Sequence, residues 1–154
     1  MQYAVNLSPR KQLIYHSLLN LCIGSFIASF LIALALTFPT FKKVFSDNSY
    51  SAILEEGLKY LFVLFLIITI KLKTSSIPFI GIGFGLLEVF ARLQSSGHIY
   101  TKPFVAHIIF GLTMALFIYL AQKSKTPFKG LFYGLALIAP AMLHIFYNLI
   151  IAKL

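Results

Sequence analysis

Acidic residues are scarce in this sequence of 154 residues, which has four of them against thirteen lysines and arginines. The four are Asp47, Glu55, Glu56 and Glu88, and only Asp47 lies in an evident loop. The three glutamates lie inside apolar stretches, and a charged side chain near the centre of a bilayer costs roughly 2.5–3.5 kcal/mol on insertion scales. Several such groups in one small protein indicate a functional site.

Other shortages exclude whole classes of protein. Charged residues make up only 11% of the chain and hydrophobic residues 59%, which excludes an ordinary soluble domain. The single cysteine, Cys22, excludes an intramolecular disulfide, and we expect it to pack inside the protein. No His-Glu-x-x-His segment occurs, which excludes a zinc site of that type. No apolar run contains an aspartate, and Ser25 lacks both a following glycine and a histidine at its depth, so aspartyl-pair and serine mechanisms are disfavoured.

Apolar runs of about 20 residues recur along the chain, and this length crosses roughly 30 Å of hydrocarbon. They predict an all-α fold, a polytopic transmembrane helical bundle with about five spans, forming a single domain over residues 1–154. The first run also has features of a signal peptide, but it is longer than a usual signal core, and we predict a spanning helix. The predicted spans are residues 13–38, 53–72, 77–95, 103–122 and 129–152.

The net charge of +9 could suggest nucleic acid, but the basic residues fall mostly in the short joins between apolar runs. Lysine and arginine in such joins anchor helix ends at lipid headgroups, so the expected partner is the lipid bilayer and not nucleic acid. With a cytoplasmic N-terminus, seven basic residues lie on the inner side and five on the outer side. This small bias favours that orientation.

The polar residues inside the spans are predicted to share one depth. Successive spans run in opposite directions, so the distance of a residue from the end of its span gives its depth. At 1.5 Å per residue, one membrane face lies roughly 3–12 Å from each of Glu55, Glu56, Glu88, His107 and His144. Four helices therefore offer polar groups to one shallow layer, which the charge bias places near the outer face. His16 and His98 lie outside this layer, and we expect structural roles for them.

Local spacings add detail to this layer. Glu55 and Lys59 are four residues apart and share a helix face, so Lys59 is expected to hold the negative charge of Glu55. His144 and Asn148 have the same spacing and can face one cavity. Carboxylate and imidazole groups beside a water-filled cleft are the usual general bases that activate water.

Glycine and proline positions predict how the helices meet. Gly81-x-x-x-Gly85 predicts a close helix–helix contact. Gly111, four residues after His107, is expected to leave space below the imidazole. Pro140 removes one backbone hydrogen bond from the last span, either as an ordinary kink or to open a cavity beside His144.

Taken singly, each polar residue also has a packing explanation, such as a favourable acid at a helix N-terminus or a bond between helices. A catalytically silent membrane scaffold or receptor therefore remains the alternative to an enzyme. A proton-coupled transporter is less favoured, because the chain shows no inverted repeat and the polar layer is shallow.

Four short motifs resemble the PrsW family of intramembrane proteases, which is related to the CAAX prenyl endopeptidases and bacteriocin-processing enzymes. They occur in the family's order, one in each of the last four spans. The resemblance implies cleavage of a peptide bond in a membrane protein or peptide substrate, such as an anti-sigma factor, in a prokaryotic cell membrane. The motifs are Glu55-Glu56-x-x-Lys59, Phe84-Gly85-x-x-Glu88, His107-x-x-x-Gly111 and His144-x-x-x-Asn148.

Carried over by position, the resemblance implies that Glu55 and His107 activate water, while His144 and Asn148 stabilise the oxyanion. It further implies that Glu56 belongs to the catalytic set and tunes the site, with Lys59 and Glu88 in supporting roles. Two chemistries remain open. Glu55, His107 and His144 could ligate Zn²⁺, or carboxylate and imidazole could act on water without a metal, which the amide of Asn148 favours.

Overall fold

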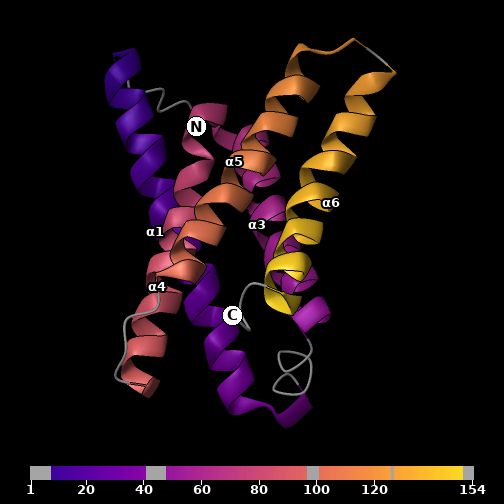
Figure 1. Cartoon of the computed structure of the whole chain (residues 1–154). Helices are drawn as coiled ribbons and strands as arrows, with labels where there is room; N and C mark the ends of the chain where they lie inside the picture. The colour runs from indigo at the N-terminus through magenta and orange to yellow at the C-terminus, as the bar shows by residue number, and fades with distance from the viewer. Residues whose placement is uncertain (1–7, 41–47, 97–100, 126, 151–154) are drawn as a thin grey trace.

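The computed structural model describes residues 8–40, 48–96, 101–125 and 127–150, and within these ranges it is helical and contains no strand. This confirms the predicted all-α fold. The long helices follow the predicted spans to within a few residues, although residues 151 and 152 of the last span lie outside the described ranges. The elements are α1 (Pro9–Thr37), α3 (Asn48–Ile70), the 3₁₀ turn η1 (Thr74–Ser76), α4 (Pro78–Ser96), α5 (Lys102–Lys123) and α6 (Phe128–Leu149) (Figure 1).

Among the described residues, four helices are long and apolar enough to cross a membrane: α1, α4, α5 and α6. They indicate a membrane-embedded protein, and many large apolar side chains are exposed on the outside of the bundle. The remaining long helix, α3, has 23 residues, but three charged side chains interrupt its apolar sequence. These side chains belong to Glu55, Glu56 and Lys59.

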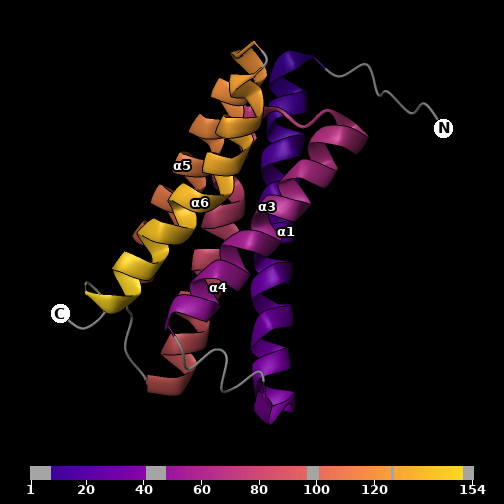
Figure 2. The same ribbon diagram turned by 90° about the vertical axis from the view of Figure 1, so that its right-hand side faces the viewer.

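The helices pack in an order that differs from their order in the chain. α4 packs between α1 and α5, α5 packs on α6, and α3 packs mainly on α6 (Figures 1 and 2). The main apolar core includes Ile27, Val63, Ile80 and Met114, from α1, α3, α4 and α5. Side chains from the first half of α3 also contact residues of α4, α5 and α6.

The close helix contact predicted at Gly81 and Gly85 of α4 is confirmed, and the structure shows that the partner helix is α5. A Cβ atom added at Gly81 would collide with the backbone carbonyl of His107, and one added at Gly85 would lie 3.0 Å from the Cα atom of Phe104. Small residues let helix backbones approach closely. Gly81 and Gly85 therefore bring α4 directly against the turn of α5 that carries His107.

Two expectations about small residues are wrong. A Cβ atom at Gly111 would lie 3.1 Å from the Cα atom of Pro78, so Gly111 serves the close approach of α4 and α5 and does not leave space below His107. Cys22 is exposed on α1 instead of packed inside. Pro140 is fully buried, and α6 continues as a helix through it.

A second set of polar contacts fastens α1 to the segment between α3 and α4. The side-chain amide of Asn20 donates to the carbonyl oxygen of Ser76 at 2.8 Å and to its hydroxyl at 3.1 Å. The backbone N–H of Lys73 donates to Nδ1 of His16 at 3.2 Å. His16 therefore has the structural role expected of it, and His98 lies outside the described residues.

Substituting Gly81 tests the close approach of α4 and α5. Gly81→Ala should lower the free energy of unfolding by roughly 1–3 kcal/mol, because the added methyl group meets backbone that cannot rotate away. The matched control is Gly134→Ala in α6, where an added Cβ atom has nothing within 4 Å. Thermal unfolding in detergent should show a lower midpoint for Gly81→Ala only, and equal midpoints for the two variants would contradict the packing described.

Candidate functional site

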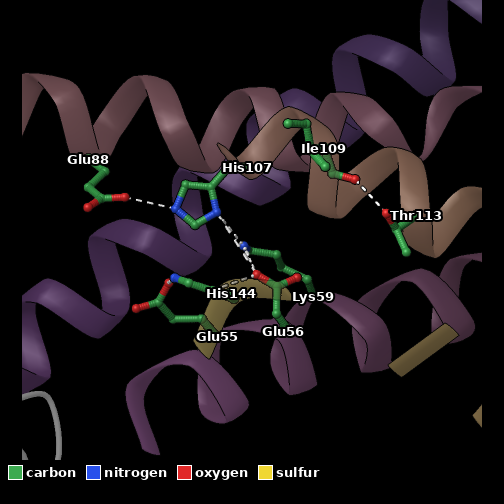
Figure 3. A network of polar contacts seen from close by, with 8 residues as sticks. All are labelled: Glu55, Glu56, Lys59, Glu88, His107, Ile109, Thr113 and His144. Carbon is green, nitrogen blue, oxygen red and sulfur yellow. Dashed lines mark hydrogen bonds and ion pairs between the residues drawn. The ribbon is translucent and has the colours of Figure 1, made fainter. Parts of the chain in front are cut away.

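Six polar side chains from four helices meet inside the bundle, and we call them the polar cluster (Figure 3). Each belongs to the layer or the motifs singled out in the sequence, so their predicted convergence is confirmed. Asn148, the seventh predicted site residue, is half-buried and lies one turn beyond His144 on α6. The cluster comprises Glu55, Glu56 and Lys59 of α3, Glu88 of α4, His107 of α5 and His144 of α6.

An ion pair between Lys59 and Glu56 occupies the centre of the cluster. Nζ of Lys59 lies 2.7 Å from Oε1 of Glu56, and the two side chains are 2% and 0% exposed. The expected pairing of Lys59 with Glu55 is therefore replaced by a pairing at i, i+3. Both spacings place side chains on one helix face, but Glu56 points inward with Lys59, whereas Glu55 is 15% exposed.

The ammonium of Lys59 also reaches α5. Nζ lies 3.1 Å from Nδ1 of His107 and 3.9 Å from the ring centroid of Phe84, where it makes a cation–π contact. An ammonium group only donates hydrogen bonds, so Nδ1 of His107 accepts. The ring then carries its proton on Nε2, which donates to Oε2 of Glu88 at 2.8 Å. Both ring nitrogens of His107 are thus engaged.

His144 has a different environment. Its Nδ1 lies 3.1 Å from Oε1 of Glu56, and an ionised carboxylate only accepts hydrogen bonds, so Nδ1–H donates. In the neutral ring, Nε2 therefore keeps its lone pair, and this atom lies 3.8 Å from Oε2 of Glu55. Of the two cluster histidines, His144 is the one whose second ring nitrogen faces the partly exposed Glu55.

Aromatic rings hold the two imidazoles in place, and the sequence analysis did not identify all of them. The ring of Phe110 stacks on His144 with centroids 4.7 Å apart and meets His107 edge-on at 5.5 Å. Tyr147 packs against Phe110 at 6.3 Å. Each of these aromatic residues follows a cluster histidine by three positions on the same helix face, and this spacing is a signal visible in the sequence.

The donor set allows a test of the predicted metal site. Glu55, His107 and His144 each offer one ligand atom, and these atoms lie within 4.8 Å of one another, so the group could hold a metal ion. Carboxylate and imidazole are also the ligands that zinc prefers. A histidine, however, binds a metal through a nitrogen lone pair, and the one lone pair of His107 faces the ammonium of Lys59. As arranged here, His107 does not offer that lone pair to a metal ion, so the three residues fit zinc poorly.

Comparison with models of protein families, with curated proteins and with solved structures gives no match for this chain.

Replacing Glu56 tests the central ion pair. Glu56→Gln leaves the ammonium of Lys59 buried without an anion, and breaking a buried pair in this way destabilises by roughly 3–5 kcal/mol. Glu88→Gln is the matched control, because Glu88 is 23% exposed and a glutamine there can still accept from His107. Thermal unfolding in detergent should show a much larger loss for Glu56→Gln, and similar losses for the two variants would contradict the central position of the pair.

Proposed function

We propose that this protein is an intramembrane hydrolase, an endopeptidase that cleaves a peptide bond in a membrane-embedded protein or peptide. One observation carries the proposal: Oε2 of Glu55 and Nε2 of His144 lie 3.8 Å apart at the partly exposed side of the polar cluster. A water oxygen can lie about 2.8 Å from both atoms, a normal hydrogen-bond length. The pair therefore suits the binding and activation of one water molecule.

The proposed reaction uses His144 as the general base. Nε2 of His144 takes a proton from the water while the water oxygen attacks the carbonyl carbon of the scissile bond. Glu56 holds Nδ1–H at 3.1 Å, which fixes the ring orientation and stabilises the imidazolium that forms. The imidazolium then returns the proton to the leaving amine as the carbon–nitrogen bond breaks. Positioned bases of this kind contribute typically 10²–10⁴-fold to the rate.

Glu55 and Asn148 complete the proposed machinery. The carboxylate of Glu55 accepts the second hydrogen bond of the water and directs its lone pair toward the substrate. Asn148 follows His144 by one turn on α6 and is proposed to donate its amide N–H to the oxyanion. The resemblance to the PrsW family implies a different division of roles, with His107 acting on water. The contacts favour His144, because both ring nitrogens of His107 are already engaged.

The same resemblance supports the substrate class and the setting of the reaction. We propose a membrane protein such as an anti-sigma factor as substrate, in a prokaryotic cell membrane with the N-terminus in the cytoplasm and the site near the outer face. Substrate and water would enter beside Glu55 and Glu88, the more exposed members of the cluster. The geometry requires no cofactor for this chemistry.

A catalytically silent scaffold or receptor remains a second candidate, and one observation favours it. The interior of the cluster is closely connected, because Lys59 contacts both Glu56 and His107 and all three side chains are almost fully buried. Such a network could serve only to hold four helices together. The two candidates differ in what Glu55 does, since Glu55 lies at the edge of that network.

Glu55→Gln is the variant that separates the two candidates. It keeps the size of the side chain but removes the carboxylate beside His144, so cleavage of a labelled transmembrane peptide in lipid should fall at least 100-fold. The unfolding midpoint should stay close to that of the wild type, because Glu55 is not part of the central ion pair. His16→Gln is the control outside the cluster and should retain cleavage. Full activity in Glu55→Gln would exclude the mechanism, and a wild-type protein that cleaves no peptide would favour the scaffold.

A pair of glutamine substitutions tests which histidine is the base. At position 107, glutamine can still accept from Lys59 and donate to Glu88, so His107→Gln should retain a measurable share of the activity. At position 144, glutamine can still donate to Glu56 but cannot take a proton, so His144→Gln should lose activity 10²–10⁴-fold. Single-turnover rates of the two variants provide the measurement. The reverse ranking would assign the base to His107.

A further inference from the structure

The ammonium group of Lys59 lies beside His107, one of the three potential metal ligands. Lys59 starts on α3, which packs mainly on α6, and its side chain crosses to α5. Its ammonium lies 2.7 Å from a carboxylate oxygen, 3.1 Å from an imidazole nitrogen and 3.9 Å from the centre of an aromatic ring. A single positive charge is thus surrounded by a carboxylate, a nitrogen lone pair and an aromatic ring, as a bound cation would be.

Two features distinguish this ammonium from a metal ion. It donates hydrogen bonds along its N–H directions, so His107 is held with the lone pair on Nδ1 toward Lys59 and the proton on Nε2 toward Glu88. It is also tethered to the backbone of α3 and cannot dissociate. A metal ion that binds Nδ1 of His107 must therefore displace the ammonium of Lys59, which is covalently attached to α3.

We propose that Lys59 is a built-in cation that replaces a metal ion in the polar cluster, fixing one tautomer of His107 and keeping divalent metals out. Lys59 is accordingly a positioning residue, since it acts through His107 and Glu56 and does not touch the proposed water. The inference rests on the proposed function only in calling the reaction metal-free. Its tests measure metal binding and tautomer, so the two proposals can fail separately.

The first test is Zn²⁺ binding to purified, metal-stripped protein in detergent, followed by calorimetry and by metal analysis after dialysis. The wild type should bind no stoichiometric Zn²⁺ through the cluster. Lys59→Met removes the ammonium at nearly constant side-chain length, and this variant should gain one Zn²⁺ per chain. Adding His144→Ala to Lys59→Met should abolish that gain. Lys73→Met is the matched control, because the ammonium of Lys73 contacts only the carbonyl oxygen of Pro9 among the contacts described for it, and it should behave as the wild type.

Two outcomes of the binding experiment would overturn the proposal. One is stoichiometric Zn²⁺ on the wild type that is lost in His144→Ala. The other is a folded Lys59→Met protein that binds no more Zn²⁺ than the wild type.

The second test uses the wild type and therefore does not depend on the folding of a variant. Nitrogen-15 spectra of the labelled histidine rings, assigned with His107→Gln, should show His107 as a neutral ring with a proton on Nε2 and a hydrogen-bonded, unprotonated Nδ1. Added Zn²⁺ should leave these signals unchanged. A proton on Nδ1, or a shift of the His107 signals on adding Zn²⁺, would contradict the role assigned to Lys59.

Discussion

Lys59 and Glu56 form an ion pair in the interior of the helical bundle, and the other polar groups are arranged around it. Removing two charges from water is unfavourable by several kcal/mol per ion, so such a pair persists only when further hydrogen bonds satisfy it. Here His107 accepts from the ammonium and His144 donates to the carboxylate. The second oxygen of Glu56 has no hydrogen-bond partner among the described residues, so Glu56 keeps capacity to accept another donor.

The ion pair gives the two histidines different hydrogen-bond partners. Both ring nitrogens of His107 are hydrogen-bonded, to Lys59 and to Glu88, whereas Glu56 holds Nδ1 of His144. The remaining nitrogen of His144 faces Glu55 at the edge of the network. One histidine with both ring nitrogens engaged and one with a ring nitrogen facing a carboxylate thus lie within one cluster, and this asymmetry is the physical basis for proposing hydrolysis.

The close approach of the backbones makes this compact arrangement possible. Gly81 and Gly85 of α4 face the turn of α5 that carries His107, and any larger residue there would move the imidazole. Phe84 lies between these glycines and supplies the ring beneath the Lys59 ammonium. One turn of α4 therefore sets the distance to α5 and also shapes the environment of the charge.

The helices and the common depth of the site residues could be predicted from the sequence, because depth depends on the number of residues along a helix of known rise. The apolar runs predicted the helices, and the depth argument placed Glu56, His107 and His144 in one layer. The small residues predicted a close helix contact at Gly81 and Gly85, although not that α5 is the partner. The sequence does not determine how each helix is rotated about its own axis. Positions i+3 and i+4 share a face, so spacing alone could not decide whether Lys59 pairs with Glu55 or Glu56.

The same limit explains the errors at Gly111 and Cys22, whose helix faces were assigned before the neighbouring helices were known. It also explains why Phe110 and Tyr147 were overlooked, since aromatic residues on membrane helices usually face lipid or core without contacting a site. The roles of His107 and His144 depend on which nitrogen faces which partner, and no spacing rule contains that information.

The most direct measurement of the central claim is the distance between the Lys59 ammonium and the His107 ring, obtained by solid-state NMR on selectively labelled protein in lipid bilayers. The structure predicts a measurable dipolar coupling between the two nitrogens, because Nζ and Nδ1 lie 3.1 Å apart. A Lys59 ammonium that shows no coupling to His107 would place the charge outside the cluster and contradict the account.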